Sequence, residues 1–476
     1  MRRHSIFPIV SVLMFIPCIL FAQGVSTKTN SLSSQLDTLI KYRLPAGSNV
    51  SVSVYDLTAN KALYGYQADK LSRPASTMKL LTTITALSRP GANEPFRTEV
   101  WYKGTIERDT LKGDIYVVGG FDPEFDDEAL DSLTSRVARS PFSVVQGRIY
   151  GDVSMKDSLY WGSGWLWDDT PYSFQPYLSP LMLGKGVVTI TASPGIQGDT
   201  ARLECTPASS YYTLANTTKT RTPDAGRFKV SRNWLENGNE ITVSGNVDGK
   251  RTGTVNIYSS QDFFMHTFLE RLRAKGVCCP ADYSFGEFQK DSVSVRIASH
   301  STSVQAVVNR IMKESDNLNA EAMLCRLGAQ LTGDRHVSAA NGLAAVRRLI
   351  KKLGYDPERY NLADGCGLSH YNYVSSELLI AFLKFAYSRT DVFQKLYKAL
   401  PIGGVDGTLK NRMKKGTPSY KNVHAKTGSF TAINCLAGYL KANNGHQIAF
   451  AIMNQNVLSG KEARKFQDAV CDILIR

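Results

Sequence analysis

A serine and a lysine three residues apart are the first residues of this chain whose types and spacing could do chemistry together. Ser76 is the only serine in the sequence with a lysine three positions later, Lys79. A serine hydroxyl needs a base to become a nucleophile at neutral pH, and this spacing at the start of a helix places both side chains on one face. Lys79 must be neutral to accept a proton, and burial or a nearby cation such as Lys426 would lower its pKa. We expect Ser76 to be a nucleophile and Lys79 its base.

A second motif, S-x-N, offers two polar groups for the same reaction. Ser315 can relay a proton toward a leaving amine, and Asn317 can hold Lys79 and a substrate amide. The pattern is weak by itself, because it also occurs at 231–233 and 244–246. Its value lies in its order and wide spacing relative to the other motifs.

The third motif, K-T-G, occurs once and is formed by Lys426, Thr427 and Gly428. Together with Ser429 it gives a strand edge that carries a cation and hydroxyl groups. Such an edge suits a free carboxylate on a peptide that pairs with the strand. The backbone N–H groups of Ser76 and Ser429 would form an oxyanion hole.

Hydrophobic periodicity predicts the elements that must carry these motifs. Near the start, it predicts a helix over 31–44, a strand over 49–55, a returning strand over 62–66 and a helix over 76–87. After about residue 300 helical patterns dominate, and the chain ends with strands and a closing helix, at 430–440, 447–455 and 463–475. We expect the two ends of the chain to complete one sheet.

The stretch from about 98 to 295 has a different character, with strand-like patterns rich in Gly, Thr and Tyr. It contains all five tryptophans and none of the three motifs. We therefore expect a β-rich insert between two halves of a catalytic domain. Within it, the acidic cluster at 122–128 is expected to be a solvated loop, with a metal role as the alternative.

The first 23 residues are expected to form a secretory signal peptide, because Arg2 and Arg3 precede an apolar run over 6–21. A retained anchor is the alternative, which the short run and Pro17 disfavour. No later segment has the length and apolarity of a membrane-spanning helix. We expect an exported protein of the periplasm or extracytoplasmic envelope, with peripheral membrane or cell-wall association left open.

Composition and absent motifs exclude several other functions. The formal charge of +14 comes from dispersed lysines and arginines, and no basic-aromatic module accompanies them, so no nucleic-acid partner is expected. G-x-S-x-G and H-E-x-x-H do not occur, which disfavours an α/β-hydrolase and a zincin. Seven cysteines remain beyond the signal, without metal-ligand spacing, so we expect no metal and no cofactor, and disulfide pairing stays open.

The order S-x-x-K, S-x-N, K-T-G is the signature of penicillin-binding proteins and serine β-lactamases. The chain after the signal resembles the class C low-molecular-mass penicillin-binding proteins, the D-alanyl-D-alanine carboxypeptidase/endopeptidase family. The segments that carry this resemblance are 73–82, 119–123, 162–169, 314–321, 404–409 and 425–429.

This resemblance implies an α/β (α+β) transpeptidase/β-lactamase-like catalytic domain with two nested β-rich inserted domains. The catalytic domain would comprise 24–97 and 296–476, inserted domain II 98–152 and 240–295, and inserted domain III 153–239. It also implies that Ser76 attacks the carbonyl between two D-alanines at the end of a peptidoglycan stem peptide. The family cuts D-Ala–diaminopimelate cross-links as well, and β-lactams would trap Ser76 as an ester.

One residue departs from the family pattern, since Cys366 stands where serine is usual in 364–369. We expect a tuned loop and retained activity. The alternative functions are a β-lactamase or related esterase, which the long insert disfavours, and a penicillin sensor that does not turn over. The balance of carboxypeptidase and endopeptidase action, the stem diamino acid, the role of the inserts and the oligomeric state stay open.

Overall fold

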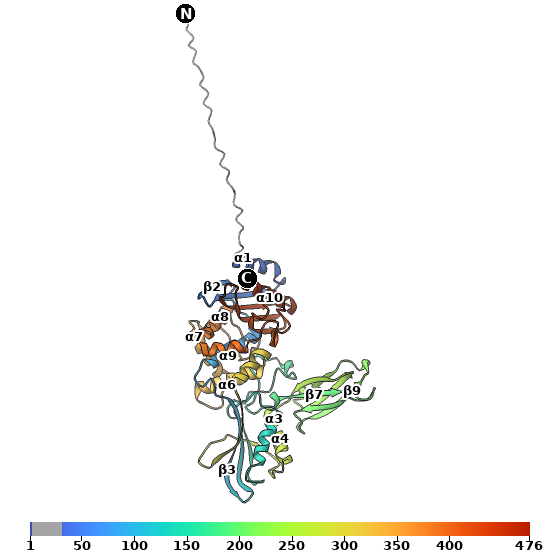
Figure 1. The fold of residues 1–476 in the computed structure, drawn as a ribbon. Coiled ribbons are helices and arrows are strands. Elements are labelled where there is room, and N and C mark those ends of the chain that lie inside the picture. The colour runs from blue at the N-terminus through green and yellow to red at the C-terminus, as the bar shows by residue number, and fades with distance from the viewer. Residues whose placement is uncertain (2–30) are drawn as a thin grey trace.

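The structure is a computed structural model, and it describes Met1 and residues 31–476. Figure 1 shows an upper part that holds α1 (Leu32–Arg43) and the C-terminus, and two lobes beyond it, one around β3 (Phe96–Glu107) and one around β7 (Val187–Ser193) and β9 (Thr213–Thr220). The expected signal peptide, 1–23, lies outside the described residues except for Met1. Among the described helices, none is long and apolar enough to cross a membrane.

The upper part is built on one antiparallel sheet of five strands in the order β15-β16-β17-β1-β2. The strands are β1 (Asn49–Asp56), β2 (Lys61–Tyr66), β15 (His424–Phe430), β16 (Ile433–Lys441) and β17 (Gln447–Gln455). The central pair joins the two ends of the sequence, with Val52 opposite Ile452. The prediction that both ends complete one sheet is confirmed.

Helices cover both faces of this sheet because its strands are apolar on both sides. On one face, α1 (Leu32–Arg43) and α10 (Gly460–Ile475) pack on the valines of β1. The other face packs on a helical layer that includes α2 (Met78–Leu87), whose ten residues are all buried. The layer continues with α6 (Asn317–Thr332), α7 (Ala339–Lys352), α8 (Ser376–Tyr387) and α9 (Thr390–Ala399).

The lobe around β3 holds a six-stranded sheet covered by α3 (Asp127–Ala138) and α4 (Ser260–Ala274). Its core is aromatic, and the rings of Phe125 and Phe264 lie 5.1 Å apart. The strands are β3 (Phe96–Glu107), β4 (Thr110–Gly119), β5 (Val144–Val145), β6 (Ile149–Asp152), β13 (Ser284–Phe285) and β14 (Ser294–Thr302).

The other lobe holds two three-stranded sheets, in the orders β12-β7-β8 and β10-β11-β9. The strands are β7 (Val187–Ser193), β8 (Arg202–Thr206), β9 (Thr213–Thr220), β10 (Lys229–Arg232), β11 (Glu240–Val247) and β12 (Arg251–Asn256). Because β11 pairs with β9 and β12 with β7, the sheets do not divide at residue 240, where the sequence placed a boundary. We propose a division near residue 257.

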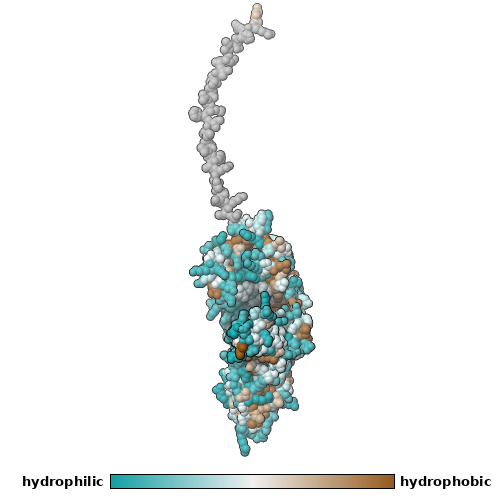
Figure 2. Space-filling model, turned by 90° about the vertical axis from the view of Figure 1, so that its right-hand side faces the viewer, coloured by the Kyte–Doolittle hydropathy of each residue, from teal (hydrophilic) through white to brown (hydrophobic). Residues whose placement is uncertain are grey.

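The exposed face in Figure 2 is mostly hydrophilic, with apolar residues in small scattered groups. The acidic segment 122–128, expected to be a solvated loop, is only partly solvated, because Asp126 and Glu128 are exposed and Asp122 is buried. Asp126 caps α3 by accepting from Ala129 N, and the buried Asp122 lies 3.0 Å from His300 Nδ1. The expectation was wrong for Asp122, whose partner His300 comes from a distant segment.

Glu124, of the same segment, belongs to a charged cluster where the inserts meet the catalytic part. Lys185 Nζ lies 2.7 Å from Glu124 Oε1, 2.5 Å from Asp316 Oδ2 and 3.1 Å from Asn319 Oδ1. Arg310 Nε donates to the second oxygen of Glu124 at 3.0 Å. Burial alone would lower the pKa of Lys185, but Asp316 and Glu124 raise it overall, so Lys185 stays charged.

Replacing Lys185 with methionine should therefore destabilise the protein. The substitution keeps the apolar stem but leaves Asp316 without its cation in a mostly buried site. We expect the free energy of unfolding to fall by about 2 kcal/mol, measured by urea denaturation. Lys219→Met, which removes an exposed lysine of β9, is the matched control; equal stability of the two variants would show that the cluster contributes nothing.

Candidate active site

Ser76 lies in a 3-10 turn, Ala75–Thr77, that leads directly into α2. Pro74 O accepts both the N–H of Thr77, at 3.2 Å, and its hydroxyl, at 2.7 Å, which fixes the turn. Ser76 is half-buried, whereas the three residues after it are buried. The turn thus presents a serine hydroxyl at the surface above a buried helix.

Lys79 is fully buried, and its Nζ lies near three oxygens, one from the neighbouring Ser76 and two from distant segments. It lies 2.9 Å from Ser76 Oγ and donates to Asn317 Oδ1 at 2.7 Å and to Cys366 O at 2.6 Å. Burial lowers the pKa of Lys79 overall, although the acidic groups around it, Asp364 among them, act in the opposite direction. A lowered pKa makes the neutral amine easier to reach, and a neutral amine beside a serine hydroxyl can accept that hydroxyl's proton.

The S-x-N motif is held by a sharp change of backbone direction. A π-helical turn, Arg310–Glu314, ends at Ser315, whose φ of 62° lies in the left-handed region. Asp316 then caps α6 by accepting from Asn319 N at 2.9 Å, so α6 begins at Asn317. This geometry turns Ser315 and Asn317 toward the two lysines of the other motifs.

Lys426, in β15, is also fully buried and lies on the other side of Ser315. Its Nζ donates to Ser315 Oγ at 2.8 Å and to Thr427 O at 2.7 Å. Burial, and then the charge of Lys79, lower the pKa of Lys426 well below its usual range. Thr427 Oγ1 donates to Thr408 Oγ1 at 2.8 Å, so a hydroxyl pair extends the polar edge.

Gly428 explains why the third motif needs a glycine. A Cβ at this position would lie 2.7 Å from Pro74 O and 2.9 Å from both Ser76 N and Thr77 N. No side chain fits in that space, because β15 lies directly against the turn that carries the nucleophile. The glycine therefore sets the distance between the strand edge and Ser76.

Beyond its first residues, the outer edge of β15 is free to pair with the backbone of a bound peptide. β15 is the end strand of the sheet, and Ala425 N donates to Pro401 O, away from β16. Because N–H groups alternate in direction along an antiparallel strand, those of Thr427 and Ser429 point to the same outer side. A bound peptide could pair there, with the N–H of Ser429 and that of Ser76 facing its carbonyl oxygen.

The loop that supplies Cys366 O to Lys79 is fixed by a buried carboxylate, Asp364. Asp364 accepts from Gly367 N at 2.7 Å, Ser369 N at 2.6 Å and Asn372 Nδ2 at 2.8 Å. Trp165 Nε1, from the inserted region, donates to the same carboxylate at 2.9 Å. These bonds hold the loop rigid beneath the lysine.

A second carboxylate, Glu321 of α6, holds the other side of the same loop. Its Oε1 accepts from Gly365 N at 2.9 Å and from Cys366 N at 2.7 Å. Burial and the nearby Asp364 raise the pKa of Glu321 to about 7. Cys366, Glu321 and Asp364 offer ligand atoms within 4.8 Å of one another, but both carboxylates already accept backbone N–H bonds. We assign them a structural role.

The inserted region also contacts the catalytic motifs, which the sequence did not predict. Asn317 Nδ2 donates to Phe174 O at 2.8 Å, and Trp165 contacts Asp364 as described. The only signal was the resemblance of 162–169 to a family segment. The insert therefore contributes contacts to the site although it contains none of the three motifs, and all four residues of the first two motifs and Lys426 meet there.

Gly428→Ala should impair covalent labelling of Ser76 much more than it impairs folding. The added methyl must displace either β15 or the turn, and a shift of about 1 Å in a reacting group can cost about 100-fold in rate. The measurement is the acylation rate constant with a fluorescent penicillin. Gly65→Ala in β2 of the same sheet is the control, since its Cβ would meet only Ala68 Cβ at 3.6 Å. A Gly428→Ala rate close to that of the control would contradict this role.

Comparisons with known proteins identify the family of this chain. A family model described as the D-Ala-D-Ala carboxypeptidase 3 (S13) family matches residues 32–476. The D-alanyl-D-alanine carboxypeptidase of Actinomadura sp. (strain R39) is 29% identical over 465 residues, 94% of this chain and 85% of that protein. The D-alanyl-D-alanine carboxypeptidase DacB of Haemophilus influenzae is 26% identical over 415 residues, 86% of this chain and 85% of that protein.

The fold has a solved counterpart in penicillin binding protein 4 (dacB) from Haemophilus influenzae. That structure gives a TM-score of 0.79 at 23% identity and covers 93% of this chain and 99% of its own. The expected family resemblance and fold class are confirmed. Because the family model spans nearly the whole described chain, the protein belongs to the D-Ala-D-Ala carboxypeptidase 3 (S13) family and is a serine-type hydrolase.

Proposed function

We propose that the protein hydrolyses the bond between two D-alanines at the end of a peptidoglycan stem peptide, through an ester on Ser76. The observation that carries this proposal is the position of Lys79 Nζ, 2.9 Å from Ser76 Oγ and 2.7 Å from Asn317 Oδ1. Relatives along nearly the whole chain are named D-alanyl-D-alanine carboxypeptidases, which supports the substrate class.

Acylation would begin when neutral Lys79 takes the proton of the Ser76 hydroxyl. The serine oxygen then bonds to the peptide carbonyl carbon, and the N–H groups of Ser76 and Ser429 stabilise the negative oxygen. Collapse of this intermediate breaks the C–N bond, and the amine of D-alanine leaves with a proton passed through Ser315. The product is an ester between the shortened peptide and Ser76.

Hydrolysis of that ester restores the enzyme. A water molecule gives up a proton to a base at the same position, adds to the ester carbonyl and displaces Ser76, which regains its proton. The shortened peptide leaves as a carboxylic acid. We assign the base to Lys79, since it is the group in contact with Ser76 Oγ.

Lys426, Thr427 and Thr408 would hold the terminal carboxylate of the substrate. A bound carboxylate would favour the charged form of Lys426, whose pKa is lowered in the free site, and a cation with adjacent hydroxyl groups suits that carboxylate. The outer edge of β15 would pair with the peptide backbone. A substrate without that carboxylate would lack this anchor.

The proposal also covers further substrates, inhibitors and the compartment in which the protein acts. Cleavage of D-Ala–diamino acid cross-links, inhibition by β-lactams and a role in cell-wall remodelling in an extracytoplasmic compartment would follow from the same site. Penicillin binding protein 4 of Haemophilus influenzae has been solved complexed with a β-lactam. Turnover of a D-Ala-D-Ala peptide, compared with that of nitrocefin, would separate a carboxypeptidase from a β-lactamase and from a sensor that does not turn over.

Ser76→Ala should abolish both release of D-alanine and covalent labelling by penicillin, because no ester can form. The measurements are D-alanine release from a D-Ala-D-Ala peptide and the mass of the penicillin-treated protein. Thr77→Ser, one residue later, is a control that keeps a hydroxyl in the turn. A labelled Ser76→Ala protein would place the nucleophile elsewhere.

Lys79→Arg should reduce the acylation rate by about 1,000-fold or more, since a guanidinium stays protonated and cannot act as a base. In the wild type, the neutral fraction of Lys79 rises with pH, so the rate should rise with pH through the lowered pKa of this lysine. We expect the variant to lose that ascending limb. Activity within a few-fold of wild type would exclude Lys79 as the proton acceptor.

Lys426→Ala should reduce kcat/KM more for a peptide with a free terminal carboxylate than for its amide. The physical reason is the loss of the cation that would pair with the carboxylate, an interaction of about 2 kcal/mol, or roughly 30-fold. Equal losses of kcat/KM on both substrates would instead mean that the substitution acts through Ser315 and Lys79, which Lys426 also influences.

A further inference from the structure

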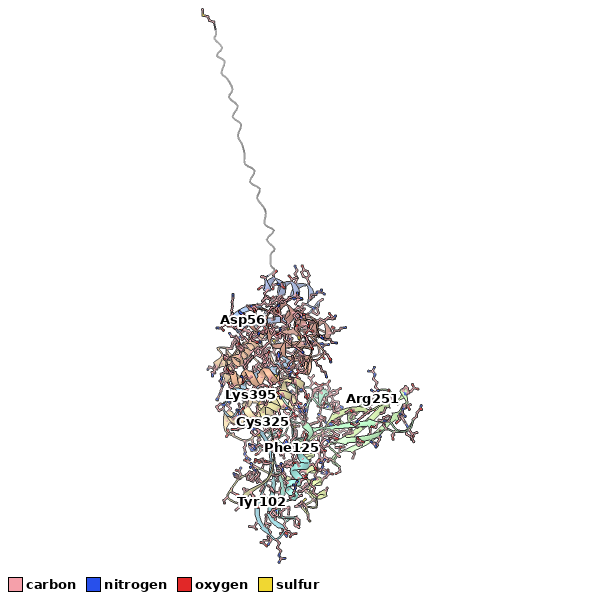
Figure 3. The ribbon with its side chains drawn as sticks, viewed as in Figure 1. Asp56, Tyr102, Phe125, Arg251, Cys325 and Lys395 are labelled. Carbon is pink, nitrogen blue, oxygen red and sulfur yellow. The ribbon has the colours of Figure 1, made fainter. Side chains whose placement is uncertain are left out.

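A cavity of about 430 Å³ lies between α6, α7 and two segments, 156–163 and 361–363. None of the residues of the three catalytic motifs lines it. Cys325 of α6 does line it, and Figure 3 shows this residue at the junction of the upper part with the inserted lobes. A volume of this size, at a boundary between regions of the chain, is typical of small-molecule sites.

The rim of the cavity is unusually apolar for a protein surface. Leu159, Trp161 and Tyr371 line it and keep 65%, 40% and 56% of their surface exposed. Deeper in, Leu324 and Leu343 are buried. Large apolar side chains grouped around a hollow, instead of scattered, mark a surface that gains stability when a ligand covers it.

One wall of the cavity carries an unpaired cation, Arg347. Ala340, Leu343 and Arg347 follow one another along α7 at spacings of three and four residues, so they share one face of the helix. All three line the cavity. Within residues 31–476, the Arg347 side chain forms no hydrogen bond, ion pair or ring contact. The other cation of the lining, Lys156, is already paired with Asp157 Oδ1 at 2.6 Å. The free guanidinium offers a two-point contact to a carboxylate.

Another part of the cavity lining contacts the loop that holds the catalytic lysine. Glu321 lines the cavity and accepts the N–H groups of Gly365 and Cys366, and Cys366 O accepts from Lys79 Nζ. A molecule in the cavity would therefore contact a side chain that is two hydrogen bonds away from Lys79. Movement of Glu321 would shift the carbonyl that holds the base.

We propose that this cavity binds a compact apolar molecule with a single carboxylate, held by Arg347, and that binding changes the acylation rate of Ser76. The apolar body of the ligand fills the space between α6 and α7 and covers Trp161 and Tyr371. The effect on rate acts through Glu321 and the loop at Cys366. Only this second part rests on the proposed function.

The binding part is tested by calorimetric titration of the full protein with 4-phenylbutyrate. We expect saturable binding of one molecule, weakened roughly tenfold in Arg347→Gln and unchanged in Arg348→Gln. Arg348 is the matched control, because it is the next residue of α7 and is exposed. The neutral amide, 4-phenylbutyramide, should bind wild type as weakly as the acid binds Arg347→Gln. Absence of binding, or equal binding by both arginine variants, overturns the proposal.

The position of the ligand is tested by closing the cavity. Ala340 is exposed and lines the cavity, so Ala340→Phe should block it without disturbing the core. We expect this variant to keep the wild-type unfolding midpoint and to lose binding of 4-phenylbutyrate. Binding that survives in a folded Ala340→Phe protein would place the ligand elsewhere.

The effect on catalysis is tested by measuring the acylation rate constant with a fluorescent penicillin at increasing 4-phenylbutyrate. We expect a change of roughly twofold or more, half complete at the calorimetric Kd, and absent in Ala340→Phe. Binding without any change in rate overturns the coupling. A protein that is never labelled would instead refute the proposed function, while calorimetry would still report on the cavity.

Discussion

The buried ammonium of Lys79 is the constraint on which the rest of this structure depends. Removing a charged amine from water costs several kcal/mol unless oxygens replace the lost hydration. Here three oxygens do so, from Ser76, Asn317 and Cys366, with donor–acceptor distances of 2.6 to 2.9 Å. These residues come from a turn, a helix start and a loop, and the turn lies more than two hundred residues before the other two. The fold must bring all three to one point, and the same burial that makes them necessary lowers the pKa of Lys79 toward the value a base requires.

Each of these oxygens is positioned by a further layer of contacts. The turn at Ser76 packs against Gly428, and the start of α6 is capped by Asp316. The loop at Cys366 donates backbone hydrogen bonds to Glu321 and Asp364. Two of these supports reach the inserted region, because Lys185 pairs with Asp316 and Trp165 donates to Asp364. The inserts are thus part of the framework of the site, although they contain none of its motifs.

The sequence predicted the local elements and the motifs better than it predicted the long-range contacts. Apolar periodicity identified the strands at both ends and the helix that follows Ser76, because each of these buries a regular set of side chains. The boundary at residue 240, which the family resemblance implied, does not match the sheets, because β11 and β12 pair with strands of the preceding segment. Strand patterns do not encode which sheet a strand joins. The acidic segment 122–128 was misjudged for a related reason, since its partners, His300 and Lys185, are remote in sequence.

The cysteine at position 366 follows from the same constraint. The atom of this residue that touches Lys79 is its backbone carbonyl, so the side chain must only fit the space between Glu321 and Asp364. Burial, together with these acidic neighbours, raises the pKa of the thiol well above its usual range, so no thiolate adds charge beside the base. A thiol is close to a hydroxyl in shape and is a weaker donor, and its Sγ lies 3.5 Å from Asp364 Oδ2. The loop therefore keeps its geometry, and the carboxylate keeps its stronger backbone donors, with either sulfur or oxygen at this position.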